Sequence, residues 1–242
     1  MADFNNLLAV ITGASSGIGK AIALRLASER MTLCLVGRNL ETLEAVAKIA
    51  HRDGANTYCF RADLAFDEDI YKLGEEIQQN FGYVDILIHS AGVISLGKIE
   101  QSRVEDLDWQ YRINVRAPYL LTKLLLPMIK SRRGQIVFVN SSVGLIARAN
   151  VGQYAATKHA LKAIADSLRE EVNADGVRVL SIFPGRTATP MQELVHKMEG
   201  RVYQPERFIQ PEDIAQVVIN ALALPRTAEV TDISIRPFRK FD

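Results

Sequence analysis

Tyr154 and Lys158, four residues apart, are side chains whose types and spacing suit acid–base chemistry. On a helix this spacing puts both on one face, with roughly 5 to 6 Å between their β-carbons. A phenol has a pKa of about 10, so proton transfer near neutral pH needs a nearby positive charge that favours the phenolate. Lys158 can supply that charge, and the hydroxyl of Ser141 can polarise a substrate carbonyl. Because a Tyr and a Lys at this spacing are common on exposed helices, the pair gains meaning only from the motifs around it.

A glycine-rich turn near the start of the chain, TGASSGIG at residues 12–19, follows an apolar run and precedes a helical pattern. Glycines let the backbone turn tightly and approach a pyrophosphate, whose charge is favoured at the start of a helix. The turn therefore predicts a dinucleotide site rather than an ordinary glycine-rich corner. The predicted contacts are Gly13, Ser15, Ser16, Gly17, Ile18 and Gly19.

The end of the second apolar run indicates which dinucleotide is preferred. An acidic residue that binds the ribose hydroxyls is typical of NAD sites, but Gly37 stands in that place and Arg38 follows it. A guanidinium can pair with a 2′-phosphate through two hydrogen bonds, which favours NADP and makes NAD less favoured. Asp63, after the third run, either binds the adenine amino group or caps a helix.

The segment His89–Gly92 (HSAG) closes the fourth apolar run. The small residues Ala91 and Gly92 permit close approach of a flat cofactor. A lone histidine at the end of an apolar run is more often a hydrogen-bonded structural residue than a catalyst, so we expect a structural role for His89.

The elements that must position these residues follow from the apolar pattern, which alternates strands with amphipathic helices. The predicted strands are residues 7–12, 31–36, 57–61, 86–89, 135–140, 178–183 and 229–236. Right-handed crossovers then give an α/β fold, a single Rossmann-type domain of residues 1–242 whose doubly wound, mostly parallel, seven-stranded sheet has helices on both faces. Ligands of such sheets bind beyond the carboxyl ends of the strands, where every motif above lies.

Two segments depart from the regular alternation. Residues 104–129 predict one long helix, bent because Pro118 lies inside it. From 185 to 210, prolines, charges and weak periodicity indicate a substrate lid at about residues 186–210, after which Pro211 starts another helix. Apolar and cationic side chains that suit a moderately apolar or acidic substrate are Met191, Leu194, Val195, Met198, Tyr203, Phe208, His196, Lys197 and Arg201.

Composition excludes several classes of function. The 242 residues carry 29 Lys and Arg against 28 Asp and Glu, so nucleic acid is not expected as a partner. The apolar runs are too short to cross a bilayer, and residues 1–8 lack the pattern of an export signal, so we expect a cytoplasmic protein that does not bind membranes. The two cysteines, Cys34 and Cys59, lie in stretches that read as interior strands and suggest neither a disulfide framework nor a metal site.

Over essentially its whole length the sequence resembles the classical short-chain dehydrogenase/reductase family. TGASSGIG fits the family motif T-G-x-x-x-G-x-G, HSAG resembles N-N-A-G, YAATK fits Y-x-x-x-K, and residues 184–189 resemble P-G-x-V-x-T. His89 departs from the family asparagine, which puts in doubt a hydrogen bond between neighbouring strands. Thr187 replaces an aliphatic residue, and Glu29 and Arg30 stand where a glycine usually ends the first helix.

The resemblance implies a role for each matched residue. Asn114 would complete a catalytic tetrad with Ser141, Tyr154 and Lys158 by holding a water on a proton path to the lysine. Family spacing selects Ser141 over the neighbouring Ser142. The nicotinamide contacts would come from Pro184, Gly185, Thr187 and Thr189.

We therefore expect an NADP(H)-preferring oxidoreductase that transfers hydride between the nicotinamide and a carbonyl or secondary alcohol, with Tyr154 as general acid and base. The substrate would be a small molecule, and the resemblance implies a homodimer or homotetramer. A rival hypothesis is an NADP-binding sensor or scaffold without turnover, for which a broken tetrad would be typical. A methyltransferase would explain the glycine turn but not Ser141, Tyr154 and Lys158.

Overall fold

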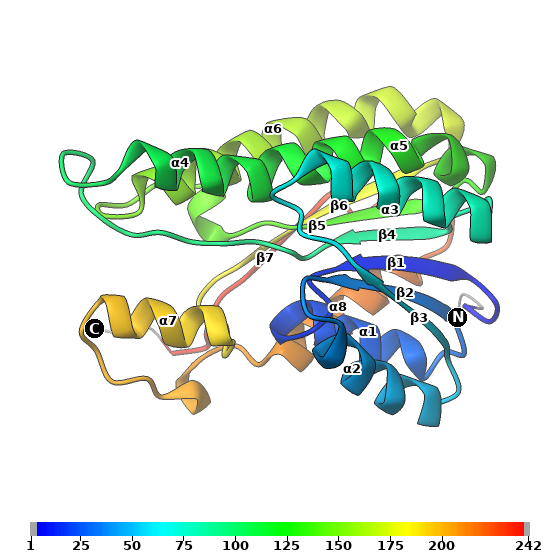
Figure 1. The fold of residues 1–242 in the computed structure, drawn as a ribbon, viewed down its shortest axis with the longest axis horizontal. Coiled ribbons are helices and arrows are strands. Elements are labelled where there is room, and N and C mark those ends of the chain that lie inside the picture. The colour runs from blue at the N-terminus through cyan, green and yellow to red at the C-terminus, as the bar shows by residue number, and fades with distance from the viewer. Residues whose placement is uncertain (1–3, 240–242) are drawn as a thin grey trace.

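The computed structural model describes residues 4–239, which form a seven-stranded sheet between two layers of helices (Figure 1). The strands are β1 Leu8–Thr12, β2 Thr32–Gly37, β3 Asn56–Arg61, β4 Ile86–His89, β5 Gln135–Val139, β6 Arg178–Pro184 and β7 Asp232–Ile235. Their order is β3-β2-β1-β4-β5-β6-β7, and all neighbours are parallel. The predicted doubly wound sheet is confirmed, and it is parallel throughout.

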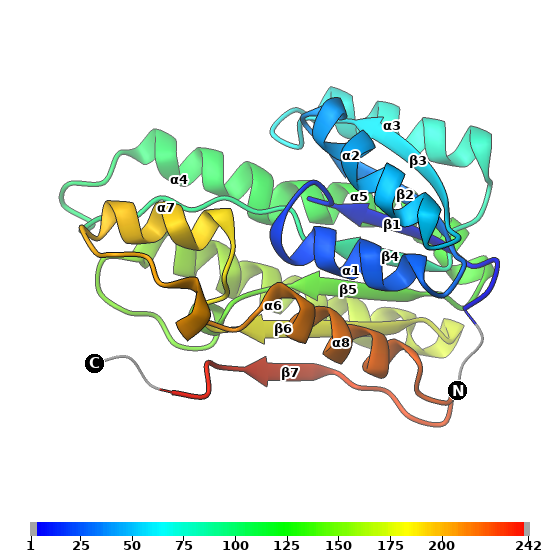
Figure 2. The ribbon, with the colours of Figure 1, turned by 90° about the horizontal axis from the view of Figure 1, so that it is seen from below.

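Eight α-helices cover the two faces of the sheet in the described part of the chain. They are α1 Gly17–Ala27, α2 Leu40–Arg52, α3 Asp67–Asn80, α4 Val104–Tyr111, α5 Ala117–Ser131, α6 Gly152–Val172, α7 Pro190–Met198 and α8 Pro211–Leu222. Figure 2 shows α1, α2 and α8 in front of the sheet, on the face opposite α3, α5 and α6. Side-chain alternation along the strands gives each layer its own core. On β1, for example, Ala9 and Ile11 face the layer of α1, α2 and α8, whereas Leu8 and Val10 face the layer of α3, α5 and α6.

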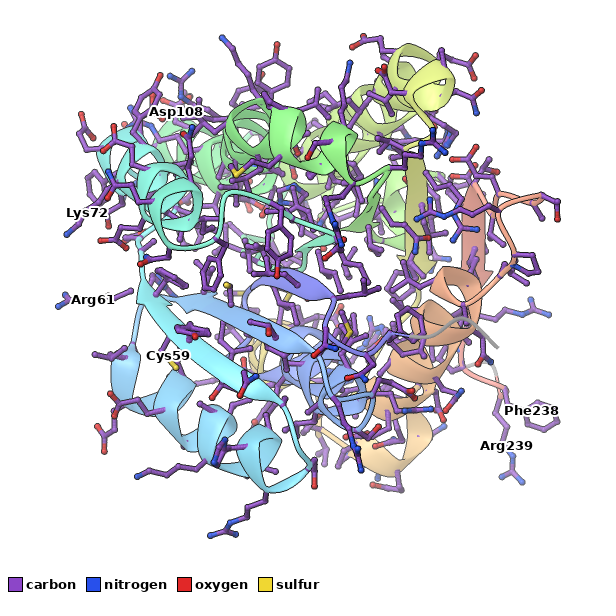
Figure 3. The ribbon with its side chains drawn as sticks, turned by 90° about the vertical axis from the view of Figure 1, so that its right-hand side faces the viewer. Cys59, Arg61, Lys72, Asp108, Phe238 and Arg239 are labelled. Atoms are coloured by element: carbon purple, nitrogen blue, oxygen red, sulfur yellow. The ribbon has the colours of Figure 1, made fainter. Side chains whose placement is uncertain are left out.

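The edge strands differ from the sequence-based prediction. Cys34 is buried on β2, but Cys59 lies on β3 at the edge of the sheet, where it is only partly buried (Figure 3). The prediction that Cys59 lies in an interior strand is therefore wrong. At the other edge β7 is shorter than the predicted 229–236. Residues 240–242 of the predicted tail lie outside the described residues.

The predicted single helix over 104–129 is divided. A π-helical turn, Arg112–Arg116, separates α4 from α5. Pro118 falls in the first turn of α5, where a missing N–H is tolerated, rather than inside one long helix. An α-helix would pair the carbonyl of Asn114 with the amide of residue 118, so the proline removes that donor. The division therefore falls at Asn114, whose surroundings are described below.

The segment 186–210 contains one helix of its own. It holds α7 and a 3₁₀ turn, Pro205–Arg207, on the side of the sheet where the strands end (Figure 1). Helix α8 then begins at Pro211, as predicted. A capping box fixes that start, because the Gln210 N–H donates to Oδ2 of Asp213 at 3.0 Å. None of the helices within residues 4–239 is long and apolar enough to span a membrane.

Candidate active site

A cavity of about 390 Å³ opens beyond the carboxyl ends of the strands, within the roughly 300 to 1,000 Å³ typical of small-molecule sites. The segments that follow β1 to β6 contribute to its lining, together with α7. The predicted site residues that line it are Gly13, Ser15, Ser16, Gly17, Ile18, Arg38, Asp63, Ala91, Gly92, Ser141, Tyr154, Lys158, Pro184, Gly185, Thr187 and Thr189. Gly19 and Asn114 are not among the described lining residues. Each lies directly behind a residue that does line the cavity, Gly19 behind Gly13 and Asn114 behind Gly92.

The glycine turn requires its glycines for two different reasons. Gly13 and Gly17 have φ of +67° and +55°, which side chains rarely adopt. Gly19 faces the turn, where an added β-carbon would collide with the carbonyl oxygen of Gly13. At Gly13 a β-carbon would lie 2.8 Å from the Cα of Ala91, so the turn also touches the loop after β4. The N-cap residue of α1, Ser16, makes no side-chain cap, and this leaves amides at the helix start open to an anion.

Thr12, which sequence reasoning did not single out, joins β1 to the loop after β4. Its Oγ1 accepts hydrogen bonds from the amides of Ser90 at 3.1 Å and Ala91 at 3.2 Å, and it lies 3.4 Å from the carbonyl oxygen of Ile88. One buried hydroxyl thus holds together the two loops that form the centre of the cavity. Its position directly before Gly13 gave no separate signal.

The two predicted residues at the β2 and β3 end of the cavity have different surroundings. Arg38 is exposed, and among the described residues its side chain makes no ion pair or hydrogen bond. Asp63 accepts a hydrogen bond from the Ala65 amide at 3.0 Å. It does not cap α3, which begins at Asp67 with Phe66 as its N-cap residue. Of the two hypotheses for Asp63, the helix cap is therefore wrong, and the cavity-lining position leaves the adenine contact as a prediction.

Tyr154 and Lys158 are both buried on α6, with 8% and 3% of their surfaces exposed. The Nζ of Lys158 donates to the carbonyl of Val139 at 3.1 Å and lies 5.7 Å from the centre of the tyrosine ring. Burial raises the pKa of Tyr154 to about 12, while a hydrogen bond with Ser141 acts in the opposite direction. Burial also lowers the pKa of Lys158 to about 8. The lysine is therefore close to the ring, but these side chains do not by themselves give the acidic phenol that the sequence led us to expect.

The choice between the two serines is clear in the structure. Ser141 is partly buried and hydrogen-bonds Tyr154, and its Oγ also accepts from the Val143 amide at 3.4 Å. Ser142 lines the same cavity but is exposed. The structure therefore brings Ser141 to the phenol, as the family spacing implied.

Asn140 is a second positioning residue that the sequence did not reveal. Its Nδ2 donates to the carbonyl of Lys158 at 3.0 Å, and its Oδ1 accepts from the Ser141 amide at 2.8 Å. The side chain therefore fixes the end of β5 against α6. A buried asparagine directly after an apolar strand was the available signal.

Asn114 lies behind the cavity wall with 1% of its surface exposed. Its Nδ2 donates to the carbonyl of Val93 at 2.9 Å and to Oγ1 of Thr157 at 3.1 Å. Its Oδ1 accepts from the Val93 amide at 2.9 Å. The Thr157 hydroxyl in turn donates to the carbonyl of Tyr154 at 2.8 Å. Asn114 thus links the loop after β4 to the helix that carries the Tyr–Lys pair.

The segment after β6 brings its predicted residues to the cavity together. The Thr187 hydroxyl donates to the carbonyl of Gly185 at 3.1 Å. Thr189 caps α7 by accepting from the Gln192 amide at 3.2 Å. Both threonines therefore shape the turn that leads from β6 to α7.

His89 has the structural role expected of it. It is buried, its Nε2 lies 2.8 Å from Oγ1 of Thr122, and its ring stacks on Phe138 at 5.0 Å. Burial lowers the pKa of His89 to about 3, so the ring is neutral at physiological pH. Phe138 is the register partner of His89 on β5, and stacking thus joins the neighbouring strands at this position.

An ion pair and aromatic contacts stabilise the segment 186–210. Arg186 forms two hydrogen bonds with Glu199, at 2.8 and 3.0 Å. His196 is buried and packs against Tyr203 and Phe208. Of the apolar and cationic residues considered earlier for this segment, only Met191 and Val195 are among the described residues that line the cavity.

Comparisons with known proteins show the family to which the chain is similar. A family model described as short chain dehydrogenase matches residues 7–200. An uncharacterized oxidoreductase of Staphylococcus epidermidis is 33% identical over 238 residues, covering 98% of this chain and 100% of the relative. The alcohol dehydrogenase from the archaeon Thermococcus sibiricus, complexed with 5-hydroxy-NADP, has a TM-score of 0.89 at 26% identity, covering 98% of this chain and 99% of that chain. A metagenomic short-chain oxidoreductase in complex with NADP has a TM-score of 0.85 at 28% identity, covering 99% and 100%.

The parallel sheet lies between two layers of helices, and a glycine turn and a buried Tyr–Lys pair meet at one cavity. This combination defines a dinucleotide-dependent oxidoreductase. The chain belongs to the short-chain dehydrogenase family, as its motifs indicated, and it is an NAD(P)-dependent enzyme of that family.

Proposed function

We propose that the chain is an NADP(H)-preferring oxidoreductase that interconverts a small-molecule carbonyl and its secondary alcohol. The observation that carries this proposal is the meeting of Ser141, Tyr154 and Lys158 with the glycine turn at one cavity. A sensor or scaffold without turnover remains the rival, and the intact set of Asn114, Ser141, Tyr154 and Lys158 argues against it.

The residues present fit a dinucleotide. The close approach of Gly13 to Ala91 and the uncapped start of α1 leave backbone amides for a pyrophosphate. Arg38 has a guanidinium without an internal partner among the described residues, which suits a 2′-phosphate, and two solved relatives are complexes with NADP or an NADP derivative. Thr187 and Thr189 would contact the carboxamide of the nicotinamide, and Asp63 the adenine.

When bound, the nicotinamide would supply or accept the hydride, and its oxidised ring would add positive charge that favours the phenolate. In the direction of reduction, Tyr154 donates its proton to the substrate oxygen, and in oxidation it removes that proton. Ser141 orients and polarises the same oxygen. Burial keeps the pKa of Tyr154 high without further positive charge, so the phenol is held as the proton donor that reduction requires.

Lys158 and Asn114 support the proton transfer from behind the phenol. Lys158 is fixed by the carbonyl of Val139 and lies near the tyrosine ring, where its charge favours the phenolate. The carbonyl of Asn114, which lacks a helical donor because residue 118 is proline, would hold the water of a proton path to Lys158.

We also propose a domain organisation, a location and an oligomeric state for the chain. Residues 1–242 act as one catalytic domain, and residues 186–210 close over the substrate as a lid. The enzyme works in the cytoplasm as a homodimer or homotetramer, which light scattering coupled to size-exclusion chromatography tests directly.

A carbonyl screen tests the proposed function. The purified chain is incubated with NADPH or NADH and a panel of ketones, aldehydes and keto acids, and loss of the reduced cofactor is followed by absorbance. Carbonyl-dependent oxidation that is faster with NADPH supports the proposal. Tight NADP binding without turnover of any carbonyl or alcohol would favour the sensor instead.

A further inference from the structure

Apolar side chains line the cavity together with Ser141 and Tyr154. The apolar side chains come from the loop after β4, the segment between β5 and α6, and α7. They are Ile94, Leu96, Val143, Val151, Met191 and Val195. Such a wall favours a substrate with an apolar body, because burial of its surface is the main source of binding energy.

Charged residues in the cavity wall fall into three groups. Arg38 and Asp63 follow β2 and β3, at the end assigned to the adenosine. Lys158 is buried and donates to the carbonyl of Val139. Arg186 and Glu199 neutralise each other through a two-point ion pair at 2.8 and 3.0 Å. These pairings leave one further charge in the wall, that of Arg148.

Like Arg38, Arg148 has no compensating partner among the described residues. Within residues 4–239 its side chain makes no ion pair and no hydrogen bond, and the residue is exposed to solvent. The cationic residues first considered for an acidic substrate, Lys197 and Arg201, are exposed and are not among the described residues that line the cavity. Arg148 is therefore the unpaired cation of the cavity wall on the substrate side.

Arg148 lies between Ser141 and Tyr154 in the sequence, and all three residues line the cavity. It lies seven residues after Ser141 and six before Tyr154, in the loop that joins β5 to α6. That loop is anchored to the loop after β4, because the Gly97 amide donates to the carbonyl of Asn150 at 2.8 Å. Arg148 thus lies two residues before an anchored position of this loop and lines the cavity.

We propose that Arg148 determines substrate specificity by binding an acidic group of the substrate. The inference rests on the proposed function and narrows it: the substrate is a carbonyl compound, or its alcohol, with an apolar body and a carboxylate or phosphate group remote from the reacting carbon. A guanidinium suits either anion, since its planar donors form two parallel hydrogen bonds with such groups.

Matched substrates test the proposal by kinetics. Keto acids of increasing chain length are compared with their methyl esters and with keto-alcohol phosphates of equal length. The wild-type chain should prefer an acid over its ester in kcat/KM, and Arg148→Gln should reduce that preference about tenfold, the value of one charge-assisted contact. Arg148→Lys should retain part of it. Whether the carboxylate or the phosphate series gains more identifies the source of the anion.

A matched control removes a neighbouring arginine. Arg103 is exposed, its side chain pairs with Glu105 and with no other described residue, and its backbone carbonyl accepts a hydrogen bond from the side chain of Gln153, next to Tyr154. Arg103→Gln should leave the acid-to-ester ratio unchanged. A wild-type chain that prefers esters, or an Arg148→Gln variant with an unaltered ratio, overturns the proposal.

A binding measurement keeps the inference separate from the proposed reaction. Amides shaped like the keto acids cannot be reduced, so their affinity is measured by calorimetry with NADP present. The amide with a free carboxylate should bind about tenfold more weakly to Arg148→Gln than to the wild type. The same amide with its carboxylate esterified should bind equally to both proteins. Equal acid affinity in the two proteins overturns the role of Arg148 even if carbonyls are turned over. A loss of acid affinity without any turnover supports Arg148 and contradicts the proposed function.

Discussion

The side chain of Asn114 and the backbone of Val93 pair through two hydrogen bonds, each of 2.9 Å. The side-chain amide of Asn114 therefore satisfies both the N–H and the carbonyl of Val93, as the backbone of a neighbouring strand would. This hydrogen bonding lies in the loop after β4, beyond the end of the sheet. Because the same Nδ2 also donates to Thr157, one buried side chain sets the distance between this loop and α6.

Asn114→Asp should lower stability, because a carboxylate cannot donate to Val93 and Thr157 and leaves their oxygens facing a buried charge. We expect a loss of about 1 to 3 kcal/mol in the free energy of unfolding, measured by urea denaturation. Asn220→Asp is the control, since Asn220 is exposed on α8 and among the described residues its side chain acts only as an oxygen acceptor, which an aspartate preserves. Equal stability of the two variants would contradict this role.

Tyr154→Phe should lower kcat by roughly 10²- to 10⁴-fold, the usual contribution of a positioned acid or base. The ring still fills its buried place, so NADP affinity and the unfolding midpoint should change little. Tyr203→Phe in the segment 186–210 removes a hydroxyl outside the described cavity wall and should leave kcat unchanged. Steady-state kinetics of the three proteins decide the matter, and nearly full turnover by the Tyr154→Phe variant would refute the assignment.

Ser141→Ala should reduce kcat by about 10²- to 10³-fold, as expected when one hydrogen-bond donor to the reacting oxygen is removed. Ser142→Ala, at the exposed neighbour, should stay within a few-fold of the wild type. A larger effect at Ser142 would move the catalytic role to that residue.

Arg38→Asp should reduce the ratio of kcat/KM for NADPH to that for NADH by about 10- to 100-fold, because it removes a charge-assisted partner of the 2′-phosphate and adds a like charge. Arg61→Asp makes the same change on the edge strand β3, where Arg61 points outward (Figure 3), and it should not alter the ratio. Unchanged selectivity in Arg38→Asp would remove the basis for an NADP preference.

His89 should make the folded protein sensitive to acid. Burial lowers the pKa of His89 from 6.5 to about 3, so above pH 6.5 the imidazole is neutral in both states and its contribution is fully present. As the pH falls below 6.5, the unfolded chain binds a proton that the folded chain does not, and the free energy of unfolding falls by about 1.4 kcal/mol per pH unit.

The test of His89 compares the wild type with His89→Asn by urea denaturation at pH 7 and pH 5. The wild type should lose about 2 kcal/mol more than the variant between these values. Equal losses would show that His89 is protonated in the folded state.

Much of the fold followed from the sequence because apolar runs and helical spacing act locally. The buried strand β4 and the start of α8 at Pro211 were predicted at their observed positions. The edge position of Cys59 was not predicted, because the order of strands in the sheet depends on pairings between segments that are distant in the sequence. The division of the helix at 112–116 was also missed, since the hydrogen bonds of Asn114 to Val93 and Thr157 span 21 and 43 residues.

The candidate site shows the same limit. Motifs located Ser141, Tyr154 and the glycine turn, because each belongs to a local pattern with fixed spacing. Asn140 and Arg148 carry no such pattern, and Thr12, although it is the first residue of the glycine motif, received no role of its own. The significance of all three depends on what lies across the cavity. We expected Lys158 together with an oxidised nicotinamide to lower the pKa of Tyr154, whereas burial, which is a property of the whole fold, raises it to about 12 in the chain alone.

The hydroxyl of Thr12 stands where β1 and β4 stop being hydrogen-bonded and their loops diverge to opposite faces of the sheet. It fixes the spacing between the two loops that follow these strands. Adaptation to new substrates can therefore proceed in the outer loops and α7, while this join between the two loops stays the same.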